Sequence, residues 1–218
     1  MALFADRRAA GRELAGALAR WRGSDAVVLG VARGGVVVAA VVAEELGLTL
    51  DAVVVRKLGA AGHEEFAVGA IAEGVRIVTP GAVRWAGMSE GDVERVEETE
   101  REELRRRTDA YGSHPADLAR RTAIVVDDGV ATGASAVAAC QAVRARGAAR
   151  VVLAVPVAPE RWRAPAEAVD EFVCPRREAD FWAVGQYYDD FGQTTDAEVI
   201  ALLTAGADGS ATTPEDGR

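Results

Sequence analysis

The sequence predicts an α/β fold with a doubly wound parallel sheet, and two observations lead to this prediction. Short apolar segments typical of strands alternate along the chain with segments of helical periodicity, which is the order of parallel strands joined by crossover helices. Half of the 218 residues are hydrophobic, which is enough to build one domain with a full core. We therefore expect a single domain over residues 1–204.

The first half of the chain is predicted to alternate between helix and strand. Leu14, Leu18 and Trp21 recur at helical spacing and predict an amphipathic helix over residues 6–21. Glycines mark the ends of elements, as in the turn at 32–35 and at Gly47. The other predicted elements are a strand at 25–31, a helix at 36–46, a strand at 51–55, a small-residue loop at 59–66, and strands at 67–72 and 75–79.

The second half begins with a highly charged helix predicted over residues 89–111. Ser89 and Asp92 resemble a capping box at its start, and its charges are typical of a solvated face. We expect the polar tail at 205–218 to be disordered. The other predicted elements are a buried strand ending at Val126, a helix after the loop that follows, a strand at 150–157, a helix around 160–168, a strand at 170–174 and a terminal helix at 195–203.

The composition excludes some classes of function. A net charge of −9 argues against nucleic-acid binding, which needs a basic face. No apolar run approaches the ~20 residues of a membrane span, and the amino terminus lacks an apolar signal core. We therefore expect a cytoplasmic protein without membrane contact. Cys140 and Cys174 lie in apolar surroundings and are expected to be reduced core residues.

Residues 122–135 give the strongest functional signal. A buried strand ends in Asp127 and Asp128, and a loop of small residues with two hydroxyls then opens a helix. Ligands of parallel α/β sheets bind at the carboxyl ends of strands, and a helix amino terminus offers unpaired N–H groups to a phosphate. The two carboxylates suit sugar hydroxyls or a metal ion beside that phosphate. The pattern indicates a phosphorylated ribose; the simpler alternative is an ordinary turn with one aspartate as a helix cap.

This motif resembles the signature of the type I phosphoribosyltransferases, enzymes that use phosphoribosyl pyrophosphate (PRPP). The resemblance implies the fold of that family, with Asp127 and Asp128 as catalytic residues that hold the ribose hydroxyls. It also implies a Mg²⁺ cofactor bound through the substrate, with these two carboxylates as the candidates for a direct contact. The residues that it assigns to the ribose 5′-phosphate are Gly129, Ala131, Thr132, Gly133, Ala134 and Ser135.

Two further segments complete the implied site. The turn at 32–35 stands where the family has a pyrophosphate-binding loop, often entered through a cis peptide bond, here between residues 32 and 33; alone, it could equally be a plain turn. Lys57, the only lysine among 25 basic residues, follows the second core strand, and the loop at 59–66 is expected to act as a flexible lid. The resemblance makes Arg33 and Lys57 catalytic. The residues it assigns to pyrophosphate are Arg33, Gly34, Gly35, Arg56 and Lys57.

The acceptor is expected to bind under a small hood built from the N-terminal helix and residues 175–204. In xanthine-type members an aromatic residue stacks on the base, and Phe181 and Trp182 are the candidates here. The alternative is that these aromatics form a small core with Trp21 and the terminal helix. Ala131 stands where hypoxanthine-guanine members have an acidic residue near the base, which leaves the acceptor open.

Over nearly its whole length the chain is similar to a group of bacterial phosphoribosyltransferases of unsettled substrate. The expected activity is transfer of the 5-phosphoribosyl group from PRPP to a nucleobase or related nitrogen nucleophile, with release of pyrophosphate, as in nucleotide salvage. We also expect a homodimer. The alternatives are a non-catalytic PRPP sensor that acts through a protein partner, and hydrolysis of phosphorylated ribose compounds at the same site.

Overall fold

Seven strands form the central sheet, in the order β4-β3-β2-β1-β5-β6-β8. The computed structural model describes residues 2–60, 63–112 and 116–209. The five strands from β2 to β8 pair in parallel, whereas β3 and β4 are added antiparallel at one edge. The strands of this sheet are β1 (Val27–Ala32), β2 (Thr49–Ala60), β3 (His63–Ala72), β4 (Val75–Val78), β5 (Thr122–Val126), β6 (Arg150–Ala154) and β8 (Glu171–Val173).

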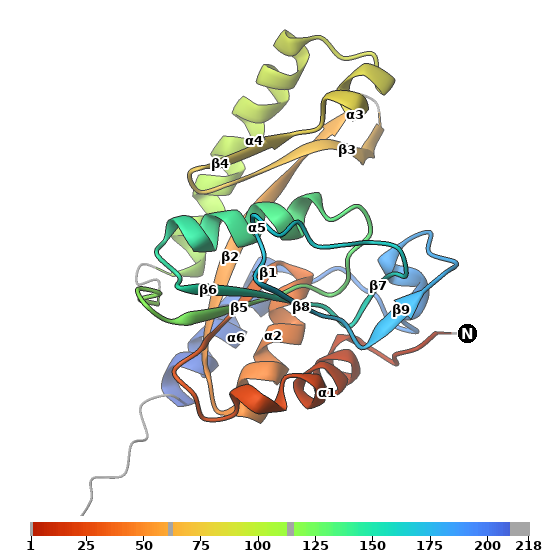
Figure 1. The fold of residues 1–218 in the computed structure, drawn as a ribbon. Coiled ribbons are helices and arrows are strands. Elements are labelled where there is room, and N and C mark those ends of the chain that lie inside the picture. The colour runs from red at the N-terminus through yellow and green to blue at the C-terminus, as the bar shows by residue number, and fades with distance from the viewer. Residues whose placement is uncertain (1, 61–62, 113–115, 210–218) are drawn as a thin grey trace, which may run out of the picture.

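Helices cover both faces of this sheet (Figure 1). Helices α1 and α2 pack on one face and α5 packs on the other, which confirms the predicted doubly wound α/β class. Two short strands, β7 (Val157–Pro159) and β9 (Arg176–Glu178), pair separately. The helices are α1 (Arg7–Ala17), α2 (Gly34–Leu46), α3 (Pro80–Trp85), α4 (Glu90–Tyr111), α5 (Ala134–Ala145) and α6 (Asp196–Gly209), with 3₁₀ turns at Ala19–Trp21 and Val184–Tyr187.

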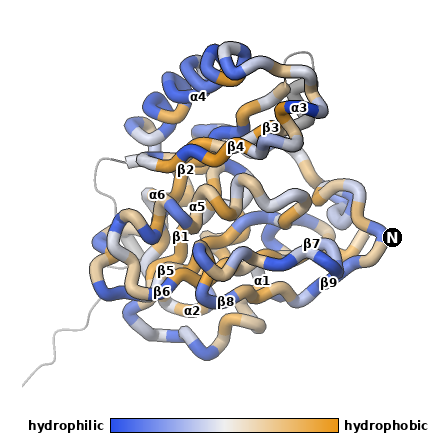
Figure 2. Tube along the Cα trace, turned by 45° about the horizontal axis from the view of Figure 1, so that its top comes forward, coloured by the Kyte–Doolittle hydropathy of each residue, from blue (hydrophilic) through white to orange (hydrophobic). Residues whose placement is uncertain are grey.

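Alternation along the strands decides which helix each side chain meets. Leu29 of β1 and Val125 of β5 belong to the buried cluster under α5. Their neighbours Val28 and Ile124 belong to the cluster under α1 and α2. Successive side chains of a strand point to opposite faces, so a strand covered on both sides is apolar throughout. Figure 2 shows the resulting hydrophobic centre.

Shortening a core side chain should destabilise the fold strongly. Ile124→Ala removes a fully buried side chain and should lower the free energy of unfolding by about 2–5 kcal/mol, through lost burial and a residual cavity. Ile200→Ala is the matched control, because Ile200 is 40% exposed on α6, and it should cost less than about 1 kcal/mol. Denaturant unfolding measures both changes. Equal losses at the two positions would contradict the assignment of the core.

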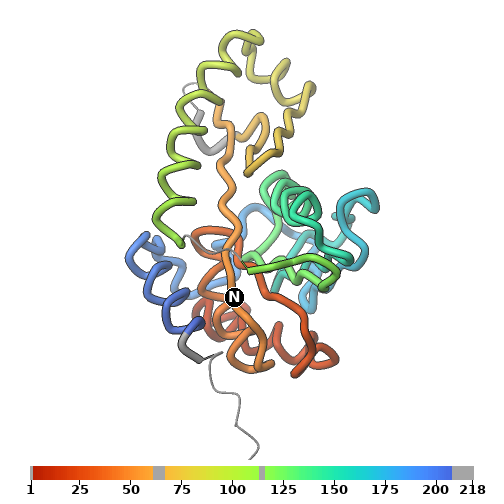
Figure 3. Tube along the Cα trace, turned by 90° about the vertical axis from the view of Figure 1, so that its left-hand side faces the viewer, coloured from red at the N-terminus to blue at the C-terminus, as the bar shows by residue number. Residues whose placement is uncertain are grey.

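An arm of β3, β4, α3 and α4 projects from the core, and the outer part of β2 runs into it (Figures 1 and 3). Because β2 continues to Ala60 and β3 begins at His63, the predicted end of the strand at 55 is wrong. The predicted lid at 59–66 is mostly strand, with residues 61 and 62 outside the described part.

The reason for this difference lies in tertiary packing. Leu58 and Ala60 are buried with Val93 and Leu104 of α4. Glycine and alanine disfavour strands when taken alone, so the small-residue stretch gives a loop signal in the sequence. Burial against α4, which is distant in sequence, overrides that preference.

Three predicted elements near the carboxyl end also differ. The strand expected at 150–157 divides into β6 and β7 at Pro156, which lacks a backbone N–H. The helix expected around 160–168 is a series of turns, and Pro165 would interrupt a helix there. Helix α6 extends to Gly209, so residues 205–209 of the predicted tail are helical, and 210–218 lie outside the described residues.

Both cysteines are free thiols, as predicted. Cys140 is buried in α5 and Cys174 is partly buried after β8. Within residues 2–60, 63–112 and 116–209, no helix has the length and apolarity to span a bilayer.

Candidate functional site

The glycine turn that follows β1 and the aspartate pair that follows β5 are in contact at the carboxyl ends of these two strands. The two strands are parallel neighbours, so Gly34 and Gly35 follow one strand where Asp127 and Asp128 follow the other. A Cβ atom on Gly35 would lie 2.7 Å from the Val126 carbonyl oxygen and 3.1 Å from Asp127 Oδ1, and one on Gly34 would overlap Asp128 Oδ2. Glycine is therefore required by this close approach. The peptide bond between Ala32 and Arg33 is cis, as predicted.

Each of the two carboxylates uses one oxygen inside the protein. Asp127 Oδ1 accepts a hydrogen bond from the Asp128 backbone N–H at 2.9 Å, and Asp128 Oδ2 accepts one from Arg7 Nε at 2.8 Å. Tyr188 Oη donates to the Asp128 carbonyl oxygen at 2.6 Å. Asp127 Oδ2 and Asp128 Oδ1 have no hydrogen-bond partner on another described residue. Each of the two successive aspartates thus keeps one acceptor oxygen that no other described residue occupies.

Burial raises the pKa of both carboxyl groups, that of Asp127 well above its usual range. The negative charge of Asp128 raises the pKa of Asp127 further, whereas the positive charges of Lys57 and Arg7 oppose the increase at both carboxyl groups. Two buried acceptors of this kind gain most from a ligand that brings hydroxyl donors or positive charge.

Lys57 and Arg56 lie on opposite faces of β2 because side chains alternate along a strand. Lys57 is exposed and, within the described residues, makes no hydrogen bond or ion pair, although its charge acts on both aspartates. Arg56 turns to the α4 face, where its Nε lies 2.6 Å from Glu100 Oε2. The structure therefore places Lys57, but not the Arg56 side chain, toward the site.

The backbone of Arg33 lies in the glycine turn, but its side chain points elsewhere. Its Nη1 is 3.8 Å from Asp196 Oδ1 at the start of α6. Asp196 also accepts hydrogen bonds from Arg106 and Tyr111, both at 2.7 Å, which lower the pKa of its carboxyl group to about 2. Arg33 thus links the glycine turn to α4 and α6.

The predicted phosphate loop leads into the amino terminus of α5. Gly133 has φ of 90° and precedes the helix, and the first backbone bond of the helix runs from Val137 N–H to the Gly133 carbonyl oxygen at 2.9 Å. The N–H groups of Ala134, Ser135 and Ala136 in the first turn are thus left for a ligand, whereas the Val130 N–H earlier in the loop donates to the Val157 carbonyl oxygen at 3.1 Å. The hydroxyls of Thr132 and Ser135 make no hydrogen bond to another described residue, so the loop retains its capacity to bind an anion.

The aromatic segment near the carboxyl end contacts the start of this loop through Val184. Val184 closely approaches Gly129, since a Cβ atom there would be 2.6 Å from Val184 Cγ1. The ring of Phe181 packs on Tyr187, with centroids 5.0 Å apart, next to a cluster that contains Phe4. Trp182 is 90% exposed. Phe181 therefore contributes to a small core, whereas Trp182 keeps both faces of its ring accessible.

That small core differs from the alternative predicted from the sequence. Trp21 packs against the α1 and α2 cluster instead, and the partners of Phe181 come from the N-terminal segment, Val157 and the turn at 184–188.

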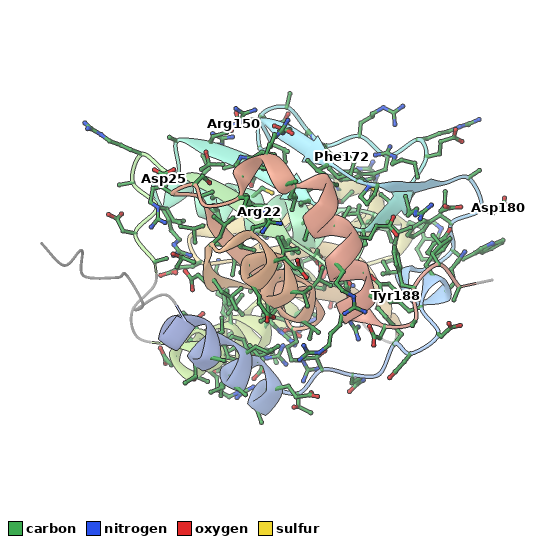
Figure 4. All side chains as sticks on the ribbon, turned by 90° about the horizontal axis from the view of Figure 1, so that it is seen from below. Arg22, Asp25, Arg150, Phe172, Asp180 and Tyr188 are labelled. Atoms are coloured by element: carbon green, nitrogen blue, oxygen red, sulfur yellow. The ribbon has the colours of Figure 1, made fainter. Side chains whose placement is uncertain are left out.

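Three residues close to the site were not identified from the sequence. Arg7 contacts Asp128, Tyr188 contacts the carbonyl group of the same residue, and Trp162 donates its Nε1–H to the Thr132 carbonyl oxygen at 3.2 Å. Figure 4 labels Tyr188, which lies beside the start of α1. An arginine among the 25 basic residues carries no local signal for a contact with a residue more than one hundred positions away.

Comparison with known proteins agrees with this arrangement. A family model described as a phosphoribosyl transferase domain matches residues 5–191. The chain belongs to the phosphoribosyltransferase family. This confirms the resemblance to the type I enzymes that residues 122–135 indicate.

Relatives of this phosphoribosyltransferase-family chain occur in Mycobacterium tuberculosis and Thermus thermophilus. A protein from two strains of Mycobacterium tuberculosis, provisionally named a phosphoribosyl transferase, is 48% identical over 207 residues, covering 93% of this chain. The chain spans about half, 47%, of the length of that relative. The crystal structure of the protein TT1426 from Thermus thermophilus is 46% identical and superimposes with a TM-score of 0.74, covering 94% of this chain and 99% of that one.

Proposed function

We propose that this chain transfers the 5-phosphoribosyl group from PRPP to a nucleobase or related nitrogen nucleophile and releases pyrophosphate. The observation that supports this most is that Asp127 Oδ2 and Asp128 Oδ1, on two successive residues between a glycine turn and a helix amino terminus, accept no hydrogen bond from another described residue. The two hydroxyls of a ribose suit two acceptors of this kind, and the flanking turns suit the phosphate groups on either side of a ribose.

In this proposal the two aspartates accept hydrogen bonds from the ribose 2′- and 3′-hydroxyls. The 5′-phosphate is bound by the loop from Gly129 to Ser135, through the N–H groups before α5 and the hydroxyls of Thr132 and Ser135. Charge-assisted hydrogen bonds to carboxylates are about twice as strong as neutral ones, so the ribose contacts should contribute much of the affinity.

Pyrophosphate is proposed to lie against the backbone of Gly34 and Gly35, with Lys57 as its positive partner. As the bond between C1′ and the pyrophosphate oxygen breaks, its electron pair passes to the pyrophosphate, and the acceptor nitrogen forms the new bond to C1′. Lys57 would stabilise the negative charge that grows on the leaving group. Arg33 could assist only after its side chain leaves Asp196, and Arg56 is bound to Glu100.

Asp127 and Asp128 carry the carboxylate oxygens that Mg²⁺ prefers, so the residues present fit Mg²⁺ bound mainly through the substrate. Mg²⁺ keeps several waters and typically uses one or two carboxylates together with substrate phosphates. Asp127 and Asp128 are the carboxylates that would contact it, and bound Mg²⁺ would neutralise charge on the pyrophosphate.

The acceptor is proposed to stack on Trp182, whose ring is exposed in the segment that contacts the start of the phosphate loop. Phe181 is less suited to this role because its ring packs on Tyr187. Ala131 offers no proton-transferring group, so the proton lost by the acceptor would pass to solvent or to the substrate phosphates.

Release of pyrophosphate from Mg²⁺-PRPP across a panel of nucleobases tests the proposal. Release that depends on one base, with formation of its 5′-mononucleotide, is the expected result. If PRPP binds but no base stimulates release, the transferase assignment fails in favour of a PRPP sensor. Release without any base would instead indicate hydrolysis.

The affinity for PRPP should decrease as the pH is lowered, at pH values where ordinary aspartates are still ionised. The raised pKa values of Asp127 and Asp128 mean that their proton uptake begins above the usual range near 3.9. Protonation removes the charged acceptors that the ribose needs. Calorimetric titration with Mg²⁺-PRPP between pH 8 and pH 5 measures the effect. The Asp127→Asn variant should lose part of this pH dependence. If the affinity of the variant and that of the unchanged protein changed identically with pH, Asp127 would not be its cause.

A further inference from the structure

We propose that Arg7 of α1 is a positioning residue that holds Asp128 so that Oδ1 faces the ribose, while tying the segment at 188–192 over the site. This inference rests on the proposed function, because it concerns how the same carboxylate meets PRPP. It gives a specific role to the N-terminal helix, which lies outside the residues 122–135 that carry the signature.

Three contacts determine the orientation of the Arg7 guanidinium. Its Nε lies 2.8 Å from Asp128 Oδ2, its Nη1 donates to the Gly192 carbonyl oxygen at 2.8 Å, and its Cζ lies 3.9 Å from the centroid of the Phe191 ring. Only 12% of the side chain is exposed. A planar guanidinium with fixed donor directions can satisfy all three contacts at once.

The backbone around Arg7 is also held in place. Asp6 caps α1 by accepting a hydrogen bond from the Ala9 N–H at 2.7 Å. Phe4 is bound on both sides, since its N–H donates to the Tyr187 carbonyl oxygen and its own carbonyl oxygen accepts from the Asp189 N–H, both at 2.9 Å. The start of α1 and residues 187–192 therefore form one unit, and Arg7 joins that unit to Asp128.

Arg7 also contacts the turn proposed for pyrophosphate. A Cβ atom on Gly34 would lie 2.9 Å from Arg7 Nε, so this turn packs directly on the ion pair between Arg7 and Asp128. With Oδ2 occupied by Arg7, the oxygen of Asp128 that remains for the ribose is Oδ1. Loss of Arg7 would let both oxygens compete for that position.

The experiment compares Arg7→Gln, Arg7→Lys and Arg8→Gln in the full chain. Arg8 is the matched control because it is exposed on the same helix and makes no hydrogen bond or ion pair with any residue the structure describes. Calorimetry with Mg²⁺-PRPP near neutral pH gives the affinity of each variant. Thermal unfolding without ligand confirms that the variants are folded.

Arg7→Gln should weaken PRPP binding about tenfold near neutral pH, the loss expected for one charged hydrogen bond. Arg7→Lys keeps a charged donor for Asp128 but lacks the planar guanidinium that also reaches Gly192, so it should restore only part of the affinity. Arg8→Gln should bind PRPP as tightly as the unchanged protein.

Two results would overturn the inference. One is that Arg7→Gln binds PRPP as tightly as the unchanged protein. The other is that Arg7→Lys binds PRPP no more tightly than Arg7→Gln, or that Arg8→Gln loses as much affinity as Arg7→Gln, since either would reduce Arg7 to a structural contact. Failure of the proposed function has a different signature, because the unchanged protein itself would then not bind PRPP.

Discussion

Asp127→Asn should weaken PRPP binding about 10- to 100-fold and at the same time make the folded protein more stable near neutral pH. The lost affinity follows from replacing a charged acceptor by a neutral one, with about 1.5–3 kcal/mol for each hydrogen bond to a charged group. The gain in stability follows from the pKa of Asp127, which burial raises well above its usual range.

The sign of the stability change follows from linkage. A carboxyl group whose pKa is higher in the folded than in the unfolded protein favours folding at low pH and loses that contribution as the pH rises through the folded-state pKa. At neutral pH the buried charge therefore opposes folding, and the neutral amide relieves it. The difference in stability should shrink as the pH is lowered.

Calorimetry with Mg²⁺-PRPP and thermal unfolding measure the two effects. Asp109→Asn is the matched control, because Asp109 is exposed on α4 and should change neither quantity. Unchanged affinity in Asp127→Asn would refute the ribose assignment. A less stable variant at neutral pH would show that Asp127 supports the fold and would contradict its raised pKa.

Lys57→Met should lower kcat about 100-fold, whereas Arg56→Met should change kcat less than about threefold. The estimate for Lys57 is the lower end of the loss seen when one group that stabilises developing negative charge is removed. The two residues are adjacent and equally charged, but alternation along β2 places them on opposite faces, and Arg56 is paired with Glu100 at 2.6 Å. Arg56→Met should instead lower stability by weakening contact between β2 and α4.

Steady-state rates of pyrophosphate release, measured with the base identified by the panel, give both values of kcat. Equal losses in the two variants would contradict the assignment of Lys57 alone to the leaving group. A large loss of kcat in Arg56→Met with little change in Lys57→Met would show that the Arg56 face of β2, and not the Lys57 face, meets the pyrophosphate.

Local patterns predicted the centre of this molecule well. The apolar segment ending at Val126, the two carboxylates after it and the glycine turn after β1 are each contained in a short stretch of sequence. Their meeting point follows from a general rule, since the carboxyl ends of adjacent parallel strands lie at one edge of the sheet. The cis peptide bond at Ala32–Arg33 was expected from the family resemblance.

What the sequence could not predict depends on contacts between distant residues. The loop signal of Gly59 and its neighbours is overridden by α4, which follows about thirty residues later. The pairing of Arg7 with Asp128 joins positions separated by 121 residues. The sequence did not predict that Arg56 and Lys57 lie on opposite faces of the sheet. Side chains alternate between faces only within a strand, and the strand was predicted to end at residue 55.

A crystal structure of this protein with Mg²⁺ and PRPP tests the central claim most directly. We expect the 5′-phosphate at residues 131–135, the ribose hydroxyls on Asp127 Oδ2 and Asp128 Oδ1, and pyrophosphate between the turn at Gly34–Gly35 and Lys57. A ribose bound away from both aspartates, or a phosphate outside the loop before α5, would contradict it.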